Sequence, residues 1–364
     1  MNDVVNQIAG TGLIALDVLL RNENAAIYTA LGGSTGNVLA ILAFLGWRSF
    51  PVAHIGLDPA GNSLLNEFRS MGSDTRFLVR QKNIQTPVIY QWPGDEEKTH
   101  RFSFACPLCG SKRRFSDYAL NQDLAHVVSE AVTDLKVFYF DRITPLALKL
   151  AKIYRNRGAI IFFEPSEMRG DAEEVQRALE LTHILKYADD RIASLIGFDL
   201  STVAVEIQTL GAKGLRFRAP SLTNEWVNLP AIGVPYMVDS AGAGDWCSAG
   251  LLYELFSESD SISPTLLRYN KLSSALRFGQ ALSALNCMYE GARGMMYSKS
   301  STYLVRAAKA LSKDKRAVLS NEKNCGQTRM RHYHKESISQ KPKASGFFQT
   351  ANPCCGALRF KLHI

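Results

Sequence analysis

Short apolar runs alternate with longer amphipathic stretches along most of the chain. The runs that indicate strands lie at residues 8–14, 52–55, 137–140, 159–163, 193–196 and 203–210. Short apolar runs separated by helical patterns of about ten to fifteen residues are typical of βαβ units. The pattern therefore predicts an α/β fold, with a mainly parallel sheet and helices on both of its faces.

Glycines mark the ends of three predicted helices, at Gly46, Gly72 and Gly291. Glycine ends helices because it reaches left-handed backbone conformations without a steric cost. The first helix opens at the glycine-rich sequence of residues 32–37, the second follows residues 56–61, and the third spans residues 266–289.

Two further β-rich runs, residues 86–92 and 98–104, do not fit the alternation with helices. A polar segment that contains proline and glycine, residues 93–97, joins them. Such a connection favours a β-hairpin. We expect this hairpin to lie outside the main sheet.

The composition indicates an ordinary globular protein. Of the 364 residues, 46% are hydrophobic, which is ample for a buried core. No apolar run reaches the roughly eighteen residues of a membrane span, and the first ten residues lack the pattern of a signal peptide. We expect a cytoplasmic protein with no membrane partner. Seven cysteines without an export signal favour thiols or a metal site over a disulfide framework.

The positive charge is concentrated in the C-terminal part of the chain. From residue 301 onward there are thirteen Lys or Arg and three Asp or Glu, a net charge of +10, which leaves −2 of the total +8 for the first 300 residues. Nucleic acid is therefore an unlikely partner of the main domain. After about residue 312 the helical periodicity fails. We interpret residues 1–300 as one domain and residues 301–364 as a basic, disordered extension.

The most informative segment is the heptad Asp-Ser-Ala-Gly-Ala-Gly-Asp at residues 239–245, which separates two apolar stretches. A strand, a glycine turn and a helix in this order present backbone N–H groups at the helix N-terminus, where phosphate oxygens can approach. Asp245 would repel a phosphate, so we interpret it as the acceptor of a proton from an attacking hydroxyl. A C-cap glycine and an N-cap aspartate would explain either feature alone.

A second glycine-containing segment, Thr-Leu-Gly-Ala-Lys-Gly at residues 209–214, follows a predicted strand. It is suited to contact nucleotide phosphates and ribose, but an ordinary turn between two strands explains it equally well. It lacks the spacing of a Walker A loop. No G-x-G-x-x-G sequence follows the first strand, which counts against an oxidoreductase.

In their order and spacing, the glycine pair followed by Asn37, the 209–214 turn and the heptad resemble the ribokinase-like (PfkB-type) carbohydrate kinases. The resemblance covers roughly residues 5–298. It implies a mainly parallel, doubly wound sheet flanked by helices, with a small β lid at about residues 15–35 and 85–105. Nucleotide and substrate would meet at the carboxyl ends of the strands. Lid edges that pair between subunits would give a homodimer.

The resemblance also implies roles for individual residues. Asp245 matches the general base, while Gly242, Ala243 and Gly244 match the anion hole. The remaining matched residues bind substrate or nucleotide. Those for the substrate are Asp17, Gly32, Gly33, Asn37 and, as a further contact, Asp141, and those for the nucleotide are Thr209, Gly211, Gly214 and, near the adenine, Gln280.

The implied cofactors are ATP, with Mg²⁺ bridging its phosphates, and a monovalent cation. Asp239 and the carbonyl groups around Ala241 and Gly291 resemble the site of that cation, K⁺. The usual Asn-x-x-Glu, which helps to organise magnesium and phosphate, is replaced here by Lys186-Tyr187-Ala188-Asp189. The lysine leaves phosphate binding in place but puts the metal arrangement in doubt.

The sequence Cys106-Pro107-Leu108-Cys109-Gly110 is not expected in a sugar kinase. A C-x-x-C knuckle is half of a tetrahedral zinc site. Because no second knuckle is present, reduced thiols in a tight turn or a redox pair are favoured over zinc. The candidates for the missing ligands are Cys325, His332, His334, Cys354 and Cys355.

The expected reaction is transfer of the γ-phosphoryl group of ATP to a hydroxymethyl group of a sugar or sugar-like molecule. One alternative is a nucleoside kinase of the same fold, in which Tyr90, Trp92 and Phe102 form a wall for the base. Another is a catalytically weak relative that binds a ligand and uses Cys106, Cys109 and the basic extension for a partner or for zinc. The intact Asp245 argues against the second alternative.

Overall fold

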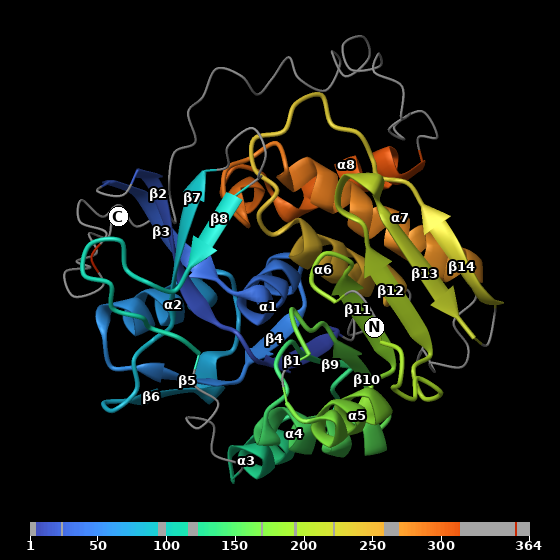
Figure 1. Cartoon of the computed structure of the whole chain (residues 1–364), viewed down its shortest axis with the longest axis horizontal. Helices are drawn as coiled ribbons and strands as arrows, with labels where there is room; N and C mark the ends of the chain where they lie inside the picture. The colour runs from blue at the N-terminus through green and yellow to red at the C-terminus, as the bar shows by residue number, and fades with distance from the viewer. Residues whose placement is uncertain are drawn as a thin grey trace.

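The computed structural model describes residues 5–22, 25–93, 100–115, 123–168, 170–192, 195–220, 223–257, 269–313 and 354. Within these residues the largest sheet has eight strands in the order β14-β13-β12-β11-β10-β9-β1-β4 (Figure 1). The six strands from β12 to β4 are parallel, and β13 and β14 extend the sheet in antiparallel fashion. Their bounds are β1 (Gln7–Thr11), β4 (Arg48–Pro51), β9 (Val137–Phe140), β10 (Ile160–Phe163), β11 (Ile184–Ala188), β12 (Val205–Thr209), β13 (Leu215–Ala219) and β14 (Thr223–Leu229).

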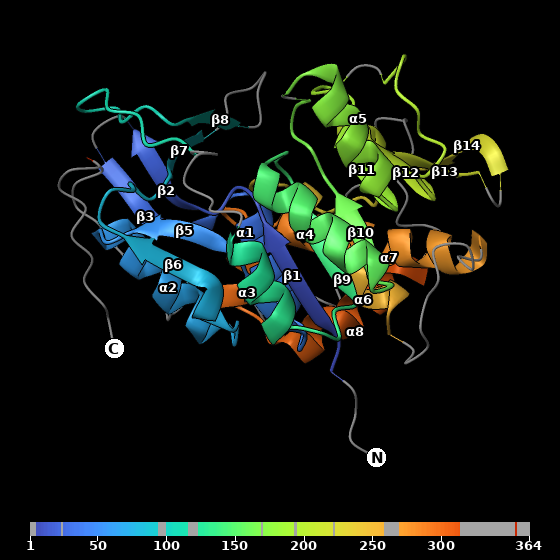
Figure 2. The ribbon, with the colours of Figure 1, turned by 90° about the horizontal axis from the view of Figure 1, so that it is seen from below.

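Helices cover both faces of this sheet, as the sequence predicts. Figure 2 shows the helices of one face in front of the strands and those of the other face behind them. Alternate residues of each buried strand point to opposite faces, so Tyr139 packs in one core cluster and Phe138 and Phe140 in the other. One group of helices is α1 (Ser34–Phe44), α6 (Ala243–Leu255), α7 (Tyr269–Asn286) and α8 (Ser301–Lys313), and the other is α3 (Asp123–Ala131), α4 (Pro145–Asn156) and α5 (Ala172–Leu181).

A separate four-stranded sheet forms the lid, in the order β3-β2-β7-β8. Its strands are β2 (Ala15–Asn22), β3 (Ala25–Gly32), β7 (Val88–Pro93) and β8 (His100–Ser103). The predicted hairpin is confirmed, because β7 and β8 are antiparallel neighbours outside the main sheet. Helix α2 (Pro59–Ser70) packs against the lid, and β5 (Ala53–Gly56) pairs only with β6 (Leu78–Gln81) among the described residues.

The register of the parallel strands places several polar residues at one edge of the sheet. Thr11 pairs with Phe140, and Phe140 pairs with Phe163. The residues that follow these three positions are Gly12, Asp141 and Glu164. Carboxyl ends of parallel strands are the usual place for ligands in open α/β sheets, and α6 begins near this edge.

Some predicted elements differ from the observed ones. The first strand ends at Thr11 because Gly12, at φ +139, turns the chain; Asp17 therefore belongs to the lid strand β2. The strand predicted at residues 193–196 is wrong where it can be checked, since Leu195 and Ile196 are not in a strand and Ile196 is 94% exposed. The sheet instead contains β11, whose apolar pattern is interrupted by Lys186. Residues 193–194 lie outside the described residues.

The C-terminal extension begins later than the sequence suggests. Residues 301–313, counted with the extension, form helix α8, which packs on α7 and buries Leu304 and Ala308 in the core. Residues 314–353 lie outside the described residues. None of the helices that the structure describes is long and apolar enough to span a membrane.

Candidate active site

The predicted anion loop forms the N-terminus of α6. Gly242 is the N-cap residue and has φ +72. A Cβ atom on Gly242 would lie 2.3 Å from the carbonyl oxygen of Ala292, so both the conformation and the close packing require glycine. The first-turn N–H groups of a helix have no acceptor within the helix. The Ala243 N–H donates to the carbonyl oxygen of Ser240 at 3.2 Å, and the positive end of the helix dipole lies at Gly242, Ala243 and Gly244.

Asp245 lies in the first turn of α6 and is partly buried. Its Oδ2 atom accepts a hydrogen bond of 2.7 Å from the side-chain amide of Asn37 on α1. Burial and the nearby charge of Glu164 raise the pKa of Asp245 to about 8, while the Asn37 bond and the charge of Lys186 lower it. A carboxyl group whose pKa lies near neutrality is suited to accept a proton during a reaction.

A buried ion pair supports the start of α6 from below. Lys186 on β11 donates to Glu164, which follows β10, and also to the carbonyl oxygen of Gly244 at 3.2 Å. Glu164 further accepts bonds from Ser248 at 2.5 Å and from Tyr139 at 3.1 Å. Burial lowers the pKa of Lys186, but the charge and hydrogen bond of Glu164 outweigh it and the net shift is upward. Lys186 therefore stays an ammonium group next to the anion loop.

Sequence reasoning flagged Lys186 but missed Glu164 and Ser248. The signal for Glu164 was an acidic residue directly after the apolar run 159–163, which matches the pattern of Asp141 after 137–140. Ser248 follows Asp245 by three residues and so lies on the same side of the helix. Its hydroxyl group also bonds the carbonyl oxygen of Gly244 at 3.2 Å.

Asp17 projects from lid strand β2 and is 6% exposed. A Cβ atom on Gly32 would lie 2.0 Å from its carboxyl carbon, so glycine at position 32 makes room for the Asp17 side chain. Burial raises the pKa of Asp17 to about 7, against a lowering by the charge of Arg293. Its Oδ1 atom is buried and has no hydrogen-bond partner among the described residues. A buried acceptor of this kind is suited to receive a bond from a ligand hydroxyl.

The glycine pair positions Asn37 at the start of α1. Gly33 is the N-cap residue with φ +78, and a Cβ atom there would lie 2.3 Å from the carbonyl oxygen of Leu13. The backbone N–H of Asn37 donates to the carbonyl oxygen of Gly33 at 2.8 Å. The tight turn thus places the Asn37 amide next to Asp245, and contact of Asn37 with a substrate stays a prediction.

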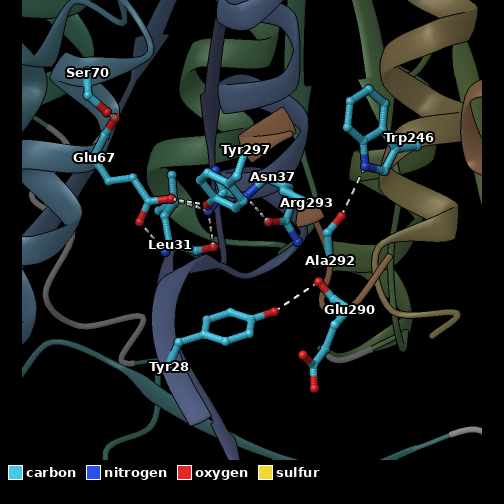
Figure 3. A network of polar contacts seen from close by, with 10 residues as sticks. All are labelled: Tyr28, Leu31, Asn37, Glu67, Ser70, Trp246, Glu290, Ala292, Arg293 and Tyr297. Carbon is cyan, nitrogen blue, oxygen red and sulfur yellow. Dashed lines mark hydrogen bonds and ion pairs between the residues drawn. The ribbon is translucent and has the colours of Figure 1, made fainter. Parts of the chain in front are cut away.

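Arg293 is a buried residue of this region that sequence reasoning missed (Figure 3). Its guanidinium group donates to the Asn37 Oδ1 atom at 3.0 Å, to the Leu31 carbonyl oxygen at 2.5 Å and to Glu67 at 2.6 Å. Tyr297 also donates to Glu67. Because Arg293 occupies the oxygen of the Asn37 amide, the nitrogen of that amide is directed at Asp245. An arginine directly after Gly291-Ala292, inside an otherwise apolar segment, was the available signal.

The carboxylate of Asp141 is engaged mainly in hydrogen bonds within the protein. Its Oδ1 atom accepts the backbone N–H of Leu13 and the hydroxyl of Thr35, both at 2.8 Å, and Arg142 contacts its other oxygen at 3.3 Å. These bonds hold the β1–β2 connection against the start of α1. Asp141 therefore positions the turn that carries Gly12, and direct contact with a substrate stays a prediction.

The oxygens of the predicted cation site come together but already have protein donors. Asp239 accepts N–H groups of Ala241 at 2.8 Å and Gly291 at 2.9 Å, and the Gln91 amide at 3.0 Å. The buried Asn286 amide donates to the carbonyl oxygens of Ala241 and Gly291 at 3.3 Å and of Ala292 at 3.2 Å. In this arrangement the residues do not fit a monovalent cation, because an N–H group points to the place where three carbonyl oxygens converge.

The residues also do not supply a magnesium site of their own. Among the described residues, no three acidic or histidine side chains gather at this edge of the sheet. Glu164 is bonded to Lys186, Ser248 and Tyr139, and Asp189 is exposed. A magnesium ion here would be held by the phosphates of a nucleotide, as is usual for this ion.

The predicted nucleotide residues lie around the end of β12. Gly211 has φ +56 and faces open space, while a Cβ atom on Gly214 would lie 2.3 Å from the Leu229 carbonyl oxygen. The Thr209 hydroxyl contacts the Tyr187 carbonyl oxygen at 3.4 Å. Gln280 donates to the carbonyl oxygen of Leu229 at 3.1 Å and also to that of Pro230. Gly214 and Gln280 thus have structural tasks, and nucleotide contact by these four residues stays a prediction.

The lid aromatic residues divide between its two faces. Asp17 on β2 lies opposite Ile89 on β7, and Phe102 on β8 lies opposite Gln91 on β7. Ile89 and Gln91 are two residues apart and therefore point to the same face of the lid. Phe102 therefore shares the face of Asp17 and is 44% exposed. Tyr90 and Trp92 point to the opposite face and pack with the core under the lid. Only one of the three residues proposed as a wall for a base is on the side of the site.

Comparison with known proteins agrees with this geometry. The chain is 26% identical over 275 residues to an uncharacterized sugar kinase of Pyrococcus horikoshii, which covers 69% of this chain and 83% of the relative. A fructokinase from Xylella fastidiosa with bound ATP superposes with a TM-score of 0.65 at 19% identity, over 84% of this chain and 99% of that one. An aminoimidazole riboside kinase from Salmonella enterica, in complex with aminoimidazole riboside and an ATP analogue, gives a TM-score of 0.62 at 20% identity, over 83% and 100%.

At these identities the solved structures show the ribokinase-type fold alone. The family follows from the sequence itself, because the model of the pfkB family carbohydrate kinases matches residues 13–299. The matched range includes the glycine pair, the 209–214 turn, the heptad and Arg293. The chain is therefore a member of the pfkB family of carbohydrate kinases.

Proposed function

We propose that this kinase transfers the γ-phosphoryl group of ATP to a hydroxymethyl group of a sugar or sugar-like molecule, with Asp245 as the general base. The observation that carries the proposal is the position of Asp245. It lies in the helix turn that presents the anion-binding N–H groups, and Asn37 directs an amide at its carboxylate. Base and proposed anion site are thus within one turn of helix, which places a proton acceptor next to the group to be transferred.

In the proposed reaction the substrate hydroxyl attacks the γ-phosphorus while Asp245 accepts its proton. A bond forms between the substrate oxygen and phosphorus, the bond from phosphorus to the bridging oxygen breaks, and ADP leaves. The N–H groups of residues 242–244 stabilise the negative charge of the transferred group. The Lys186 ammonium group, held at the Gly244 carbonyl, adds a fixed positive charge behind this loop.

Substrate hydroxyls would be bound by Asp17 and Asn37 from two sides. The unpartnered Oδ1 atom of Asp17 offers an acceptor on the lid, and Asn37 lies between the lid and Asp245. A hydroxyl left without a partner in such a buried place would cost about 1–3 kcal/mol. Ligands that satisfy these groups should therefore be preferred over deoxy analogues.

A riboside or nucleoside substrate is the second candidate. Phe102 lies on the same face of the lid as Asp17 and is 44% exposed, and an aromatic ring is suited to stack on a base. The aminoimidazole riboside kinase from Salmonella enterica shows the same fold around a riboside. The packing of Tyr90 and Trp92 in the core weakens this candidate, because it leaves a single aromatic contact.

The test is ATP turnover by the purified full-length chain with a panel of sugars and nucleosides. We expect turnover with a sugar, and we expect Asp245→Asn to lower kcat by about 10²–10⁴-fold while a thermal-shift assay still detects ATP binding. Asp199→Asn, at an exposed aspartate, is the matched control and should leave turnover unchanged.

Normal turnover by Asp245→Asn would overturn the proposed base. Turnover with nucleosides alone would favour the second candidate. The absence of ATP consumption with every acceptor would instead support a ligand-binding relative without catalysis. A homodimer through the lid edges and the role of the C-terminal extension stay predictions.

A further inference from the structure

Three cysteines from two distant parts of the chain come together beside the lid. The sulfur atoms of Cys106, Cys109 and Cys354 all lie within 4.8 Å of one another. Cys106 is buried, Cys354 is partly buried and Cys109 is exposed. Sequence reasoning disfavoured zinc at Cys106 and Cys109 because the other ligands were missing. The structure supplies a third one, from the C-terminal part of the chain.

The loop that carries the first two cysteines is a closed knuckle. The Cys106 N–H donates to the Ser111 carbonyl oxygen, and the Gly110 N–H donates to the Cys106 carbonyl oxygen, both at 2.9 Å. A bridge between Ala105 and Lys112 closes its base. Gly110 has φ +69, which only glycine adopts at no cost. The backbone therefore holds the two thiols on one compact loop before any ion binds.

Both ends of the knuckle are anchored to the lid region. On one side it follows β8 directly. On the other side, the Arg113 carbonyl oxygen accepts the N–H of Val88 at the start of β7, and the Arg113 guanidinium group pairs with Asp58 at 3.1 Å. Asp58 in turn caps α2 through the Gly61 N–H at 2.8 Å. A preorganised pair of ligands on such a support loses little entropy when it binds a metal.

We propose that Cys106, Cys109 and Cys354 bind a structural zinc ion. Zinc–sulfur bonds of about 2.3 Å in a tetrahedron put the sulfur atoms about 3.8 Å apart, which is close to the observed grouping. Thiolates select zinc over hard ions such as magnesium or calcium. The ion is separate from the phosphoryl-transfer chemistry, because its ligands follow the outer lid strand β8 and come from a segment beyond α8.

The fourth position of the tetrahedron is left to a water molecule. The other ligands that the sequence offers, Cys325, His332, His334 and Cys355, lie outside the described residues. Zinc at this place would fasten the end of the C-terminal extension to the lid.

Metal content of the full-length chain tests the proposal. After expression with zinc in the medium, elemental analysis of the purified protein should find about one zinc per chain. Cys106→Ser and Cys354→Ser should each lose most of the metal, whereas Cys287→Ser, at a cysteine outside the cluster, should retain it. Circular dichroism of each variant shows whether it is folded. Cobalt added to the metal-free wild type should give the visible absorption of a tetrahedral thiolate site.

Three outcomes would overturn the proposal. They are a wild-type chain without zinc or cobalt binding, full zinc retention by a folded Cys354→Ser variant, and a disulfide among the three cysteines in peptides mapped without reduction. If a serine variant does not fold, the cobalt spectrum of the wild type still decides. None of these measurements depends on kinase activity, so the zinc site and the proposed function can fail independently.

Discussion

At the scale of single residues, the central arrangement is the line from Glu67 through Arg293 and Asn37 to Asp245. Glu67 and Arg293 form a fully buried pair, and Arg293 fixes which end of the Asn37 amide faces the carboxylate. The Asn37 bond lowers the pKa of Asp245 against the larger effect of burial. Arg293 is therefore a positioning residue, which acts on the reaction through Asn37.

This role predicts a change in the pH dependence of the reaction. A general base must be ionised, so kcat/KM of the wild type should rise with pH and level off above a midpoint near the Asp245 pKa of about 8. The double variant Glu67→Gln/Arg293→Met removes both charges and releases Asn37. We expect its kcat/KM to fall by about 10²-fold and its midpoint to move to higher pH. The measurement is kcat/KM from pH 6 to pH 10.

A purely structural role for Arg293 would lower the rate equally at every pH and leave the midpoint in place. The matched control removes an exposed ion pair remote from the site, Arg48 with Asp74. Arg48→Met/Asp74→Asn should leave the midpoint unchanged, since exposed pairs contribute little.

At the scale of elements, the start of α6 depends on the strands beneath it. Lys186 on β11 and Glu164 after β10 form a buried ion pair under the anion loop. The charge that Lys186 brings into the buried strand is thus matched within the same site.

Removal of the Lys186 charge alone should lower the free energy of unfolding far more than removal of the Lys186 and Glu164 charges together. Lys186→Met leaves the Glu164 carboxylate buried without its cation and is expected to cost about 3–5 kcal/mol of the free energy of unfolding. Lys186→Met/Glu164→Gln should recover most of this loss. Chemical denaturation of the two variants checks the prediction, and a double variant as unstable as the single one would contradict it.

The contact that Asn286, at the end of α7, makes with carbonyl groups near the start of α6 predicts how the enzyme responds to monovalent cations. The Asn286 amide already donates to three carbonyl oxygens that would otherwise converge on an ion. Turnover should therefore change by less than about twofold when potassium is replaced by choline at constant ionic strength. Asn286→Ala frees the three oxygens and should make turnover dependent on potassium. A wild type that needs potassium would refute this account.

How far the sequence predicts these elements depends on how local their signals are. The heptad, the glycine pair and Asp17 were identified because their signals are local. Each depends on residue types that stand close together in the sequence. Arg293 and Glu67 are 226 positions apart in sequence, and no local pattern indicates that they meet. Strand β11 was missed for a related reason, since Glu164, the partner that makes Lys186 acceptable in a buried strand, follows a different strand, β10.

At the scale of the whole molecule, the fold was predictable and its C-terminal boundary was not. Alternating strands and helices specify a doubly wound sheet, and the polar turn at residues 93–97 indicated the hairpin of the lid, whereas the strands at the edge of the main sheet needed the structure. Helix α8 was assigned to the extension because its surface is basic, although Leu304 and Ala308 lie on a buried side. Charge in a sequence reports on a solvated face and does not say whether the opposite face is packed.

The buried acids predict how global stability depends on pH. Asp17 and Asp245 have folded-state pKa values raised to about 7 and about 8, so between pH 4 and pH 8 the folded state binds more protons than the unfolded state. Their contribution to stability is present at low pH and is lost as the pH rises. His183, with a pKa lowered to about 4, acts in the opposite direction but only below about pH 6.5.

The free energy of unfolding should therefore decline from pH 6.5 to pH 8, where the opposing effect of His183 fades and that of the acids dominates. Urea denaturation at several pH values measures the slope, and Asp17→Asn should reduce it because an amide does not titrate. A slope that is flat or rising in the wild type, or equal in the two proteins, would show that Asp17 does not retain its proton in the folded state.

Four consecutive residues, 290–293, touch every part of the proposed machinery. The Glu290 carbonyl oxygen binds Tyr28 of the lid, the Gly291 N–H binds Asp239, Ala292 packs on Gly242, and Arg293 holds Asn37. A substitution in this segment would alter lid, anion loop and base together. A change of acceptor is thus expected to involve the lid at Phe102, which is 44% exposed and belongs to none of the contacts made by residues 290–293.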